Sequence, residues 1–306
     1  MTRIAFKRYL PEISMGLIIL IWGFHFIVIK DAISGFDSRT YNSIRFAVGA
    51  PILSLLGLRY WRRLAWRDGV RLLLLSLMGQ TGYQVLFMQG LSLTTSTNTA
   101  LLTATLPVWT AVLSIVLGLV RIHRLMILGV IITFGGVALV VLGQSGSRLS
   151  LSHDDLIGSG LVLLGTLLSA VFNLYSKPIV DRYGGMAVAL WTYWITVVSL
   201  AVYALPQLVA LSADDLPLRI WPNLFYSGVL AGVGGYVVWN YALRELGPSR
   251  AVNYYNFTPL VAAFAGVIVL GEPITAGLML GGTLTLLGVV IVRRNLYLRP
   301  PRSDSP

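Results

Sequence analysis

Ten windows of about 20 mostly apolar residues, the length that a helix needs to cross the hydrocarbon core of a bilayer, follow one another along this chain. They lie at 10–30, 39–59, 70–91, 95–119, 124–143, 156–177, 185–206, 222–244, 250–270 and 275–294. Of all 306 residues, 56% are hydrophobic and 11% are charged, whereas soluble domains have about 25% charged residues. The sequence therefore predicts an all-α integral membrane protein, with ten transmembrane helices in a single membrane domain, 1–306.

The sequence lacks the usual patterns of enzyme and cofactor sites. It has no cysteine, which excludes disulfides and thiolate metal sites. We find no cluster of His, Asp and Glu for a metal, no Ser-His pair at bilayer depth and no glycine-rich phosphate loop. The first window shows no small-x-small cleavage pattern, so we expect a retained helix rather than a signal peptide. The prediction is a protein without cofactor or metal that is not an enzyme.

Basic residues gather on one side of the predicted membrane. The termini and even-numbered links hold 18 Lys and Arg residues, and the opposite links hold four, namely Lys30, Arg39, Arg148 and Arg219. Cytoplasmic loops carry the excess of basic residues, so both termini are expected in the cytoplasm and the net charge of +11 does not indicate nucleic acid. One further basic residue, Arg45, lies inside the second window, about 10 Å deep. It could snorkel outward, cap carbonyls or bind an anionic substrate group.

The chain also contains an internal repeat. Sliding 105–140 by 152 residues onto 257–292, without a gap, gives nine identical pairs in 36 positions. The pairs include Pro107 with Pro259, Gly129 with Gly281, Thr133 with Thr285 and Gly136 with Gly288. The period spans five helices, an odd number, so the second copy must enter the bilayer from the opposite side. We predict two inverted five-helix repeats, 1–147 and 148–306, which are typical of transporters that bind substrate near the midplane. The alternative is a duplicated scaffold without transport.

Polar and aromatic side chains inside the windows are costly in lipid unless they face a cavity or another helix. Several recur at spacings of three and four, which place them on one face of a helix. We expect these facing stripes to line a cavity between the first, third, fourth, sixth, eighth and ninth helices. The predicted substrate-binding residues are Trp22, His25, Tyr83, Gln84, Phe87, Asn98, Asn173, Tyr236, Trp239, Asn240, Asn253 and Asn256.

Each of these residues also has a structural interpretation. His25 could be a hydrogen-bonding wall or proton-sensitive gate, or a neutral histidine satisfied by a neighbouring helix. The amides could cross-link helices, and Trp or Tyr near membrane ends could belong to the interfacial belt. Pro107 and Pro259 lie inside spans and are predicted to act as hinges in gating. No acid lies at the middle of a span, so uniport and proton antiport both remain open.

Several short motifs resemble those of EamA transporters, which belong to the drug/metabolite transporter superfamily. They are Trp22-Gly23 with Lys30, Arg45-Phe46, Tyr241-Ala242-Leu243, Leu246-Gly247, the two mid-span prolines and the turn Gly271-Glu272-Pro273. The resemblance covers nearly the whole chain and is best at 236–292. In the first repeat Leu119-Val120-Arg121 stands in place of the acidic turn, so an acid with the same role in both halves is not expected. The charge pattern places Glu272 at the outer surface, where it is expected to cap a helix or shape a turn rather than couple ions.

The resemblance, which is greatest to bacterial amino-acid exporters, implies a function. It implies a secondary transporter in the bacterial inner membrane that exports aromatic or other neutral amino acids, and related small metabolites, by alternating access. The expected partners are a small-molecule substrate and the lipid bilayer, and a monomer is compatible with the sequence. The alternatives are a sugar-phosphate or nucleotide-sugar exchanger of the same superfamily, a channel, and a membrane scaffold without transport.

Overall fold

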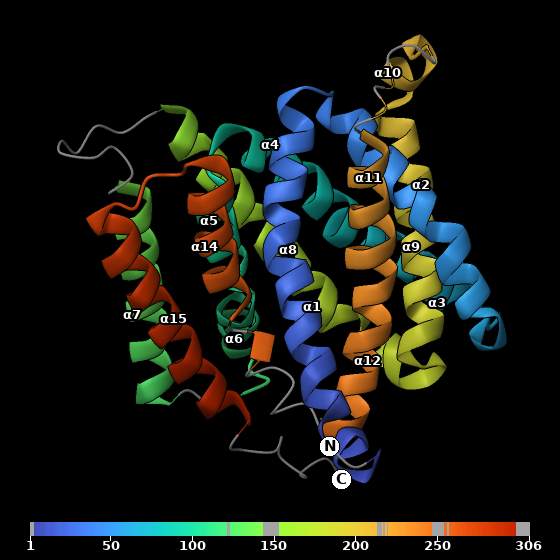
Figure 1. The fold of residues 1–306 in the computed structure, drawn as a ribbon. Helices are drawn as coiled ribbons and strands as arrows, with labels where there is room; N and C mark the ends of the chain where they lie inside the picture. The colour runs from blue at the N-terminus through green and yellow to red at the C-terminus, as the bar shows by residue number, and fades with distance from the viewer. Residues whose placement is uncertain are drawn as a thin grey trace, which may run out of the picture. The chain divides into compact units, whose positions relative to one another are not determined.

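The computed structural model describes residues 3–120, 123–142, 153–212, 216, 218, 220–246, 254–255 and 257–297. Within these ranges the chain is helical and contains no strand (Figure 1). The elements are α1 (Arg3–Ser34), α2 (Ser38–Leu56), η1 (Leu58–Tyr60), α3 (Trp66–Ser76), η2 (Leu77–Thr81), α4 (Gly82–Leu93), α5 (Ser96–Thr103), α6 (Leu106–Val116), α7 (Arg124–Leu142), α8 (His153–Tyr183), α9 (Gly185–Tyr203), α10 (Leu205–Ala210), α11 (Ile220–Phe225), η4 (Tyr226–Gly234), α12 (Gly235–Leu246), α14 (Thr258–Leu270) and α15 (Ala276–Tyr297).

The described part of every apolar window is mainly helical, which confirms the all-α membrane fold. Six helical segments among the described residues are long and apolar enough to span a bilayer: Tyr9–Ser34, Ser96–Val116, Arg124–Leu142, His153–Tyr183, Gly185–Tyr203 and Ala276–Arg294. The other windows hold helices that are shorter, interrupted or more polar, such as α14 with 13 residues. The total of ten spans stays a prediction.

The chain forms two compact units. The first unit consists of Met1–Leu73 and Ile179–Gly271, and the second of Leu74–Pro178 and Glu272–Pro306. Each unit takes segments from both halves of the sequence, so the units divide the chain differently from the predicted repeats, 1–147 and 148–306. The inverted repeat stays a prediction.

In the second unit α7 and α15 pack side by side through glycines (Figure 1). A Cβ on Gly136 would lie 2.6 Å from the carbonyl oxygen of Gly281, and one on Gly288 would lie 2.6 Å from that of Gly129. Side-chain carbons do not approach so closely, so only glycine allows this backbone contact. Early residues of α7 meet late residues of α15, so the two helices are antiparallel.

These contacts are self-complementary. The 152-residue offset converts the pair Gly129–Gly288 into the pair Gly281–Gly136, as a two-fold axis between two copies would. The hydroxyls of Thr133 and Thr285 repeat the same symmetry, since each donates to the carbonyl four residues earlier, at 2.8 Å. This agreement supports the predicted repeat.

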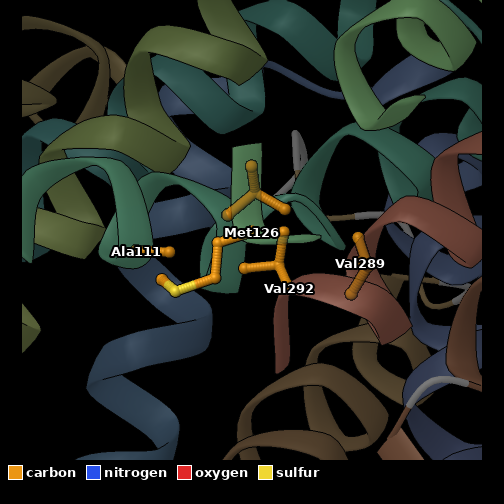
Figure 2. Close-up of a cluster of buried hydrophobic side chains, with 5 residues drawn as sticks. Ala111, Met126, Val289 and Val292 are labelled. Carbon is orange, nitrogen blue, oxygen red and sulfur yellow. The ribbon is translucent and has the colours of Figure 1, made fainter. Parts of the chain in front are cut away.

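An aliphatic cluster lies beside the glycine contact of α7 with α15, which we call the seam, and packs α6 against it. Figure 2 shows Ala111 of α6, Met126 of α7, and Val289 and Val292 of α15 drawn together, and each is at most 1% exposed. Because lipid tails are themselves apolar, it is the close van der Waals packing of these side chains that stabilises the three helices against each other.

Two helical windows contain π-helical turns, η2 in the third and η4 in the eighth. The 152-residue offset carries Leu77–Thr81 onto residues 229–233, which lie inside η4. A π turn interrupts the regular pairing of the α-helix and leaves backbone carbonyls available to other donors, and such turns are frequent at functional sites. The two interruptions therefore occur at equivalent places of the predicted repeat.

Both mid-span prolines lie in the first turn of a helix. Pro107 follows the break between α5 and α6, and Pro259 is the second residue of α14. A first-turn residue has no intrahelical partner for its N–H, so proline is tolerated there. The fourth window is interrupted at Ala104-Thr105, just before Pro107, and the hinge role of the prolines stays a prediction.

Candidate functional site

Three aromatic rings meet in the first unit, and we call them the aromatic group. Trp22 of α1 and Trp239 of α12 lie with ring centroids 5.8 Å apart. Tyr255 is 5.5 Å from Trp22 and 5.9 Å from Trp239, edge to face in both cases. Two of the predicted site residues are thus brought together. The face of an aromatic ring attracts cations, and aromatic rings pack on one another edge to face or in offset stacks. The group has the chemistry to hold an ammonium or an aromatic side chain.

Tyr255 is not among the residues that the sequence predicts for the site, although Asn253 and Asn256 of the same window are. Phe257 lies in a turn just before α14 and is 55% exposed, so the ninth window is not one regular helix and helical spacing is a poor guide to its inward face. The side chain of Asn240, together with Asn253 and Asn256, lies outside the described residues.

Trp22 also binds the π-helical turn. Its indole N–H donates to the carbonyl oxygen of Ala231 in η4, at 2.9 Å. A Cβ on Gly235 would collide with that indole nitrogen, so glycine is required at this position. The hydroxyl of Tyr226 donates to the carbonyl of Ile21 at 2.9 Å and makes a second link from η4 to α1. The aromatic group is therefore attached to an interrupted helix.

The rest of η4 and α12 is held by α2 and α9. Tyr41 of α2, fully buried, has its hydroxyl 2.6 Å from that of Ser227. A Cβ on Gly49 would lie 2.7 Å from the carbonyl oxygen of Gly228, so α2 and η4 touch through their backbones. The predicted residue Tyr236 is half-buried, and its hydroxyl donates to the carbonyl of Gly185 at 3.2 Å.

Arg45 lies buried beside His25 in the first unit. Its side chain is 4% exposed, its Nε donates to Asn42 Oδ1 at 2.9 Å and its Nη1 lies 3.2 Å from His25 Nε2. A guanidinium has no acceptor, so His25 Nε2 accepts and the imidazole proton is on Nδ1. The guanidinium also lies 5.1 Å from the centre of the Phe46 ring. His25 thus takes part in the buried polar contacts of α1 with α2.

The remaining predicted residues lie in the second unit. Tyr83 and Phe87 of α4 stack at 5.6 Å, beside Gln84, which is half-buried. Asn98 is fully buried, and its amide donates to Thr94 Oγ1 and to Ser159 Oγ of α8, each at 2.9 Å. Asn173 is exposed on α8. The contacts of Asn98 are those of a helix cross-link, and a role of any of these residues in substrate binding stays a prediction.

Glu272 caps a distant helix. One carboxylate oxygen accepts from the N–H and hydroxyl of Ser96, both at 2.7 Å, and the other accepts from the N–H of Thr97 at 3.1 Å and from its hydroxyl. A carboxylate at a helix N-terminus satisfies free N–H groups and complements the helix dipole. The predicted capping role is confirmed, and the capped helix is α5.

The model of the EamA-like transporter family matches residues 11–142 and 156–294, one range in each predicted repeat. The chain belongs to this family. This protein is thus a multi-pass membrane transporter of small molecules and not an enzyme, as the sequence predicts.

Two relatives of this EamA transporter match over nearly their whole length. An uncharacterized transporter of Archaeoglobus fulgidus is 26% identical over 283 residues, 92% of this chain and 98% of that protein. A probable terminal-alkyne amino-acid exporter of Streptantibioticus cattleyicolor is 26% identical over 299 residues, 96% of each. A protein known from a crystal structure has the same fold, with a TM-score of 0.62, 15% identity and coverage of 94% of this chain and 97% of that one.

Proposed function

We propose that this EamA transporter exports amino acids with aromatic or other neutral side chains, and related small metabolites, from the cytoplasm by alternating access. Both termini would be cytoplasmic, in the inner membrane of a bacterial cell. The observation that carries the proposal is the aromatic group, formed by Trp22, Trp239 and Tyr255 around an interrupted helix. The probable amino-acid exporter among the relatives supports this substrate class.

An amino acid suits the aromatic group for two chemical reasons. The faces of the two indoles attract an ammonium group without a buried carboxylate, and such contacts contribute about 1–2 kcal/mol when water is excluded. The same rings contact an apolar or aromatic side chain over a large area. Carbonyls and N–H groups of an interrupted helix can satisfy the remaining polar atoms of a zwitterion.

A sugar-phosphate or nucleotide-sugar exchanger is a weaker candidate. Phosphate recognition favours several guanidinium or ammonium groups with free donors. Arg45 is buried and already binds Asn42 and His25, and Lys177 is exposed near the end of α8. These two basic residues are the candidates that the spans offer, and neither is near a second one in sequence.

The π-helical turn gives alternating access a physical basis. The Ala231 carbonyl is bound by Trp22 in the present conformation. A return of η4 to α-helical pairing would withdraw this carbonyl and rotate everything that follows, including Trp239. Substrate held by both tryptophans would be released by the same step.

Efflux from proteoliposomes tests the proposal. Liposomes loaded with radiolabelled tryptophan or leucine should lose label only when they contain the protein, at a saturable rate. Trp239→Ala should lower the initial rate at least tenfold. Trp221→Ala, which changes an exposed tryptophan of α11, should stay within about twofold. Unchanged efflux by well-folded Trp22→Ala and Trp239→Ala variants would show that the site is misplaced. Exchange of sugar phosphates alone would favour the second candidate.

A further inference from the structure

The segment that joins α2 to α3 and enters the first turn of α3, residues 57–67, has both basic and apolar exposed side chains, and we call it the arginine link. Its arginines are all exposed: Arg59, Arg62, Arg63 and Arg67. Between them Trp66 is 84% exposed and Leu58 is 64% exposed. Exposed tryptophan and leucine beside guanidinium groups are unusual on a surface that contacts only water.

The arginine link has a fixed backbone. The indole N–H of Trp191 in α9 donates to the carbonyl of Arg62 at 2.9 Å, and Trp61 packs edge to face on the same indole at 5.3 Å. Further along, the N–H of Ala65 donates to the hydroxyl of Tyr183 at 3.1 Å. The arginines therefore extend from an ordered platform rather than from a flexible loop.

The acidic residue nearest to these arginines in sequence, Asp68, forms its hydrogen bonds with residues at the end of α8. Asp68 accepts from Arg182 at 2.6 Å and from the Tyr183 hydroxyl at 2.9 Å. These two donors, Tyr183 first and then Arg182, hold the pKa of the Asp68 carboxyl below its usual range, so it stays ionised and bound to them. Asp68 thus anchors α3 to the end of α8 and leaves the link with its positive charge.

We infer that the arginine link is a binding site for the headgroups of anionic phospholipids in the leaflet beside it. The link joins two membrane helices, so it lies at the membrane–water interface. Guanidinium groups bind phosphate through two parallel N–H···O contacts. Trp66 and Leu58 supply what a lipid needs and a free phosphate does not, which is apolar contact at the boundary between headgroups and acyl chains.

Binding of phosphatidylglycerol to the full-length protein tests this inference. Retention of phosphatidylglycerol and phosphatidylcholine by protein released from mixed micelles would be compared by native mass spectrometry. The wild-type protein should prefer phosphatidylglycerol. At about fivefold per basic residue near an anionic surface, Arg62→Gln with Arg63→Gln should weaken its binding by roughly 25-fold. Trp66→Ala should weaken it by roughly threefold.

Two matched variants separate charge from fold. Arg62→Lys with Arg63→Lys keeps the charge and should bind within about threefold of the wild type. Arg124→Gln removes an exposed arginine at the start of α7 and should bind normally. Equal retention by the wild type and the double glutamine variant would overturn the inference. So would displacement of the lipid by inorganic phosphate or polyglutamate, which would identify the site as one for free anions or acidic polypeptides.

Discussion

The seam of α7 with α15 and the contact of η4–α12 with α1 both depend on glycine, but they use it differently. In the seam, Gly136 and Gly288 let two regular helices touch, and the hydroxyls of Thr133 and Thr285 bond within their own helices. In the other region Gly235 admits the indole of Trp22, which donates to a backbone carbonyl of an irregular helix.

The difference indicates which region can change conformation. The backbone pairing of α7 and α15 is complete without help from other elements, so a change of register would break close packing and gain no hydrogen bond. In η4 the Ala231 carbonyl accepts a hydrogen bond from a side chain of another helix. A switch between π and α pairing exchanges one hydrogen bond for another, which keeps the two forms close in free energy. We expect a rigid seam and a mobile η4.

The largest effect is expected from Gly136→Leu. Its side chain would meet the N–H of Thr285 at 2.5 Å and the carbonyl oxygen of Gly281 at 2.6 Å, so the seam must open. We expect the free energy of unfolding in detergent to fall by about 3 kcal/mol or more. Gly135→Leu is the control, because nothing lies within 4 Å of a Cβ at Gly135. Equal melting temperatures for both variants would contradict the rigid seam.

Gly235→Ala should affect transport more than stability. The added methyl group displaces the Trp22 indole from the Ala231 carbonyl, while the rest of the fold keeps its packing. We expect initial efflux rates to fall about tenfold, since a partly buried hydrogen bond and the geometry of the site are lost together. In Gly234→Ala the nearest atom is the Val229 carbonyl oxygen at 3.4 Å, and transport should be nearly normal. Similar losses in both variants would argue against a specific role of Trp22.

Trp22→Phe removes the N–H donor and part of the ring system but keeps an aromatic ring. The Ala231 carbonyl then loses this donor, which should cost about 1 kcal/mol of unfolding free energy, measured by chemical denaturation in detergent. Efflux should fall several-fold. A Trp22→Phe variant as stable as the wild type would mean that the carbonyl has another donor.

Glu272→Gln should lower stability by about 1 kcal/mol, because a neutral amide replaces a carboxylate at the N-terminus of α5. The charged cap acts on α5 in the second unit and not on the aromatic group, so efflux per folded protein should be unchanged. Thermal unfolding and efflux of the same preparation measure both quantities. A large loss of efflux at unchanged stability would indicate ion coupling by Glu272.

The smallest effect is expected at Asp68, because its partner Arg182 is largely exposed to solvent. The folded pKa of Asp68 is lowered, so its contribution is present above the unfolded value of about 3.9 and is lost as pH falls through the folded value. Asp68→Asn should therefore melt slightly below the wild type at pH 7, and the difference should shrink in acid. A difference that grows as pH falls would contradict the assigned pKa direction.

The sequence was sufficient to predict the all-α membrane fold and the family, because apolar length and short motifs are local properties. Contacts between distant segments were beyond it. Glu272 was expected to cap a helix, but a local pattern could not identify α5 as its partner. The repeat alignment pairs Gly271 with Leu119, but the glycine with left-handed backbone conformation after α6 is Gly118. The alignment is therefore displaced by one residue at this turn.

The π-helical turns were also missed, since inserting one residue into a helical turn does not change which residues are apolar. The contacts of Tyr255 with Trp22 and Trp239 were missed for a different reason, because they join separate helical segments and spacing rules group residues only within one helix.

Hydrogen–deuterium exchange with and without substrate tests the central claim most directly, namely that the mobile η4 region binds the exported amino acid. Tryptophan added to the reconstituted protein should slow the exchange of backbone amides in residues 226–239. Exchange in residues 129–140 and 281–292, at the seam, should not change. Equal protection of both regions, or protection of the seam alone, would contradict the claim.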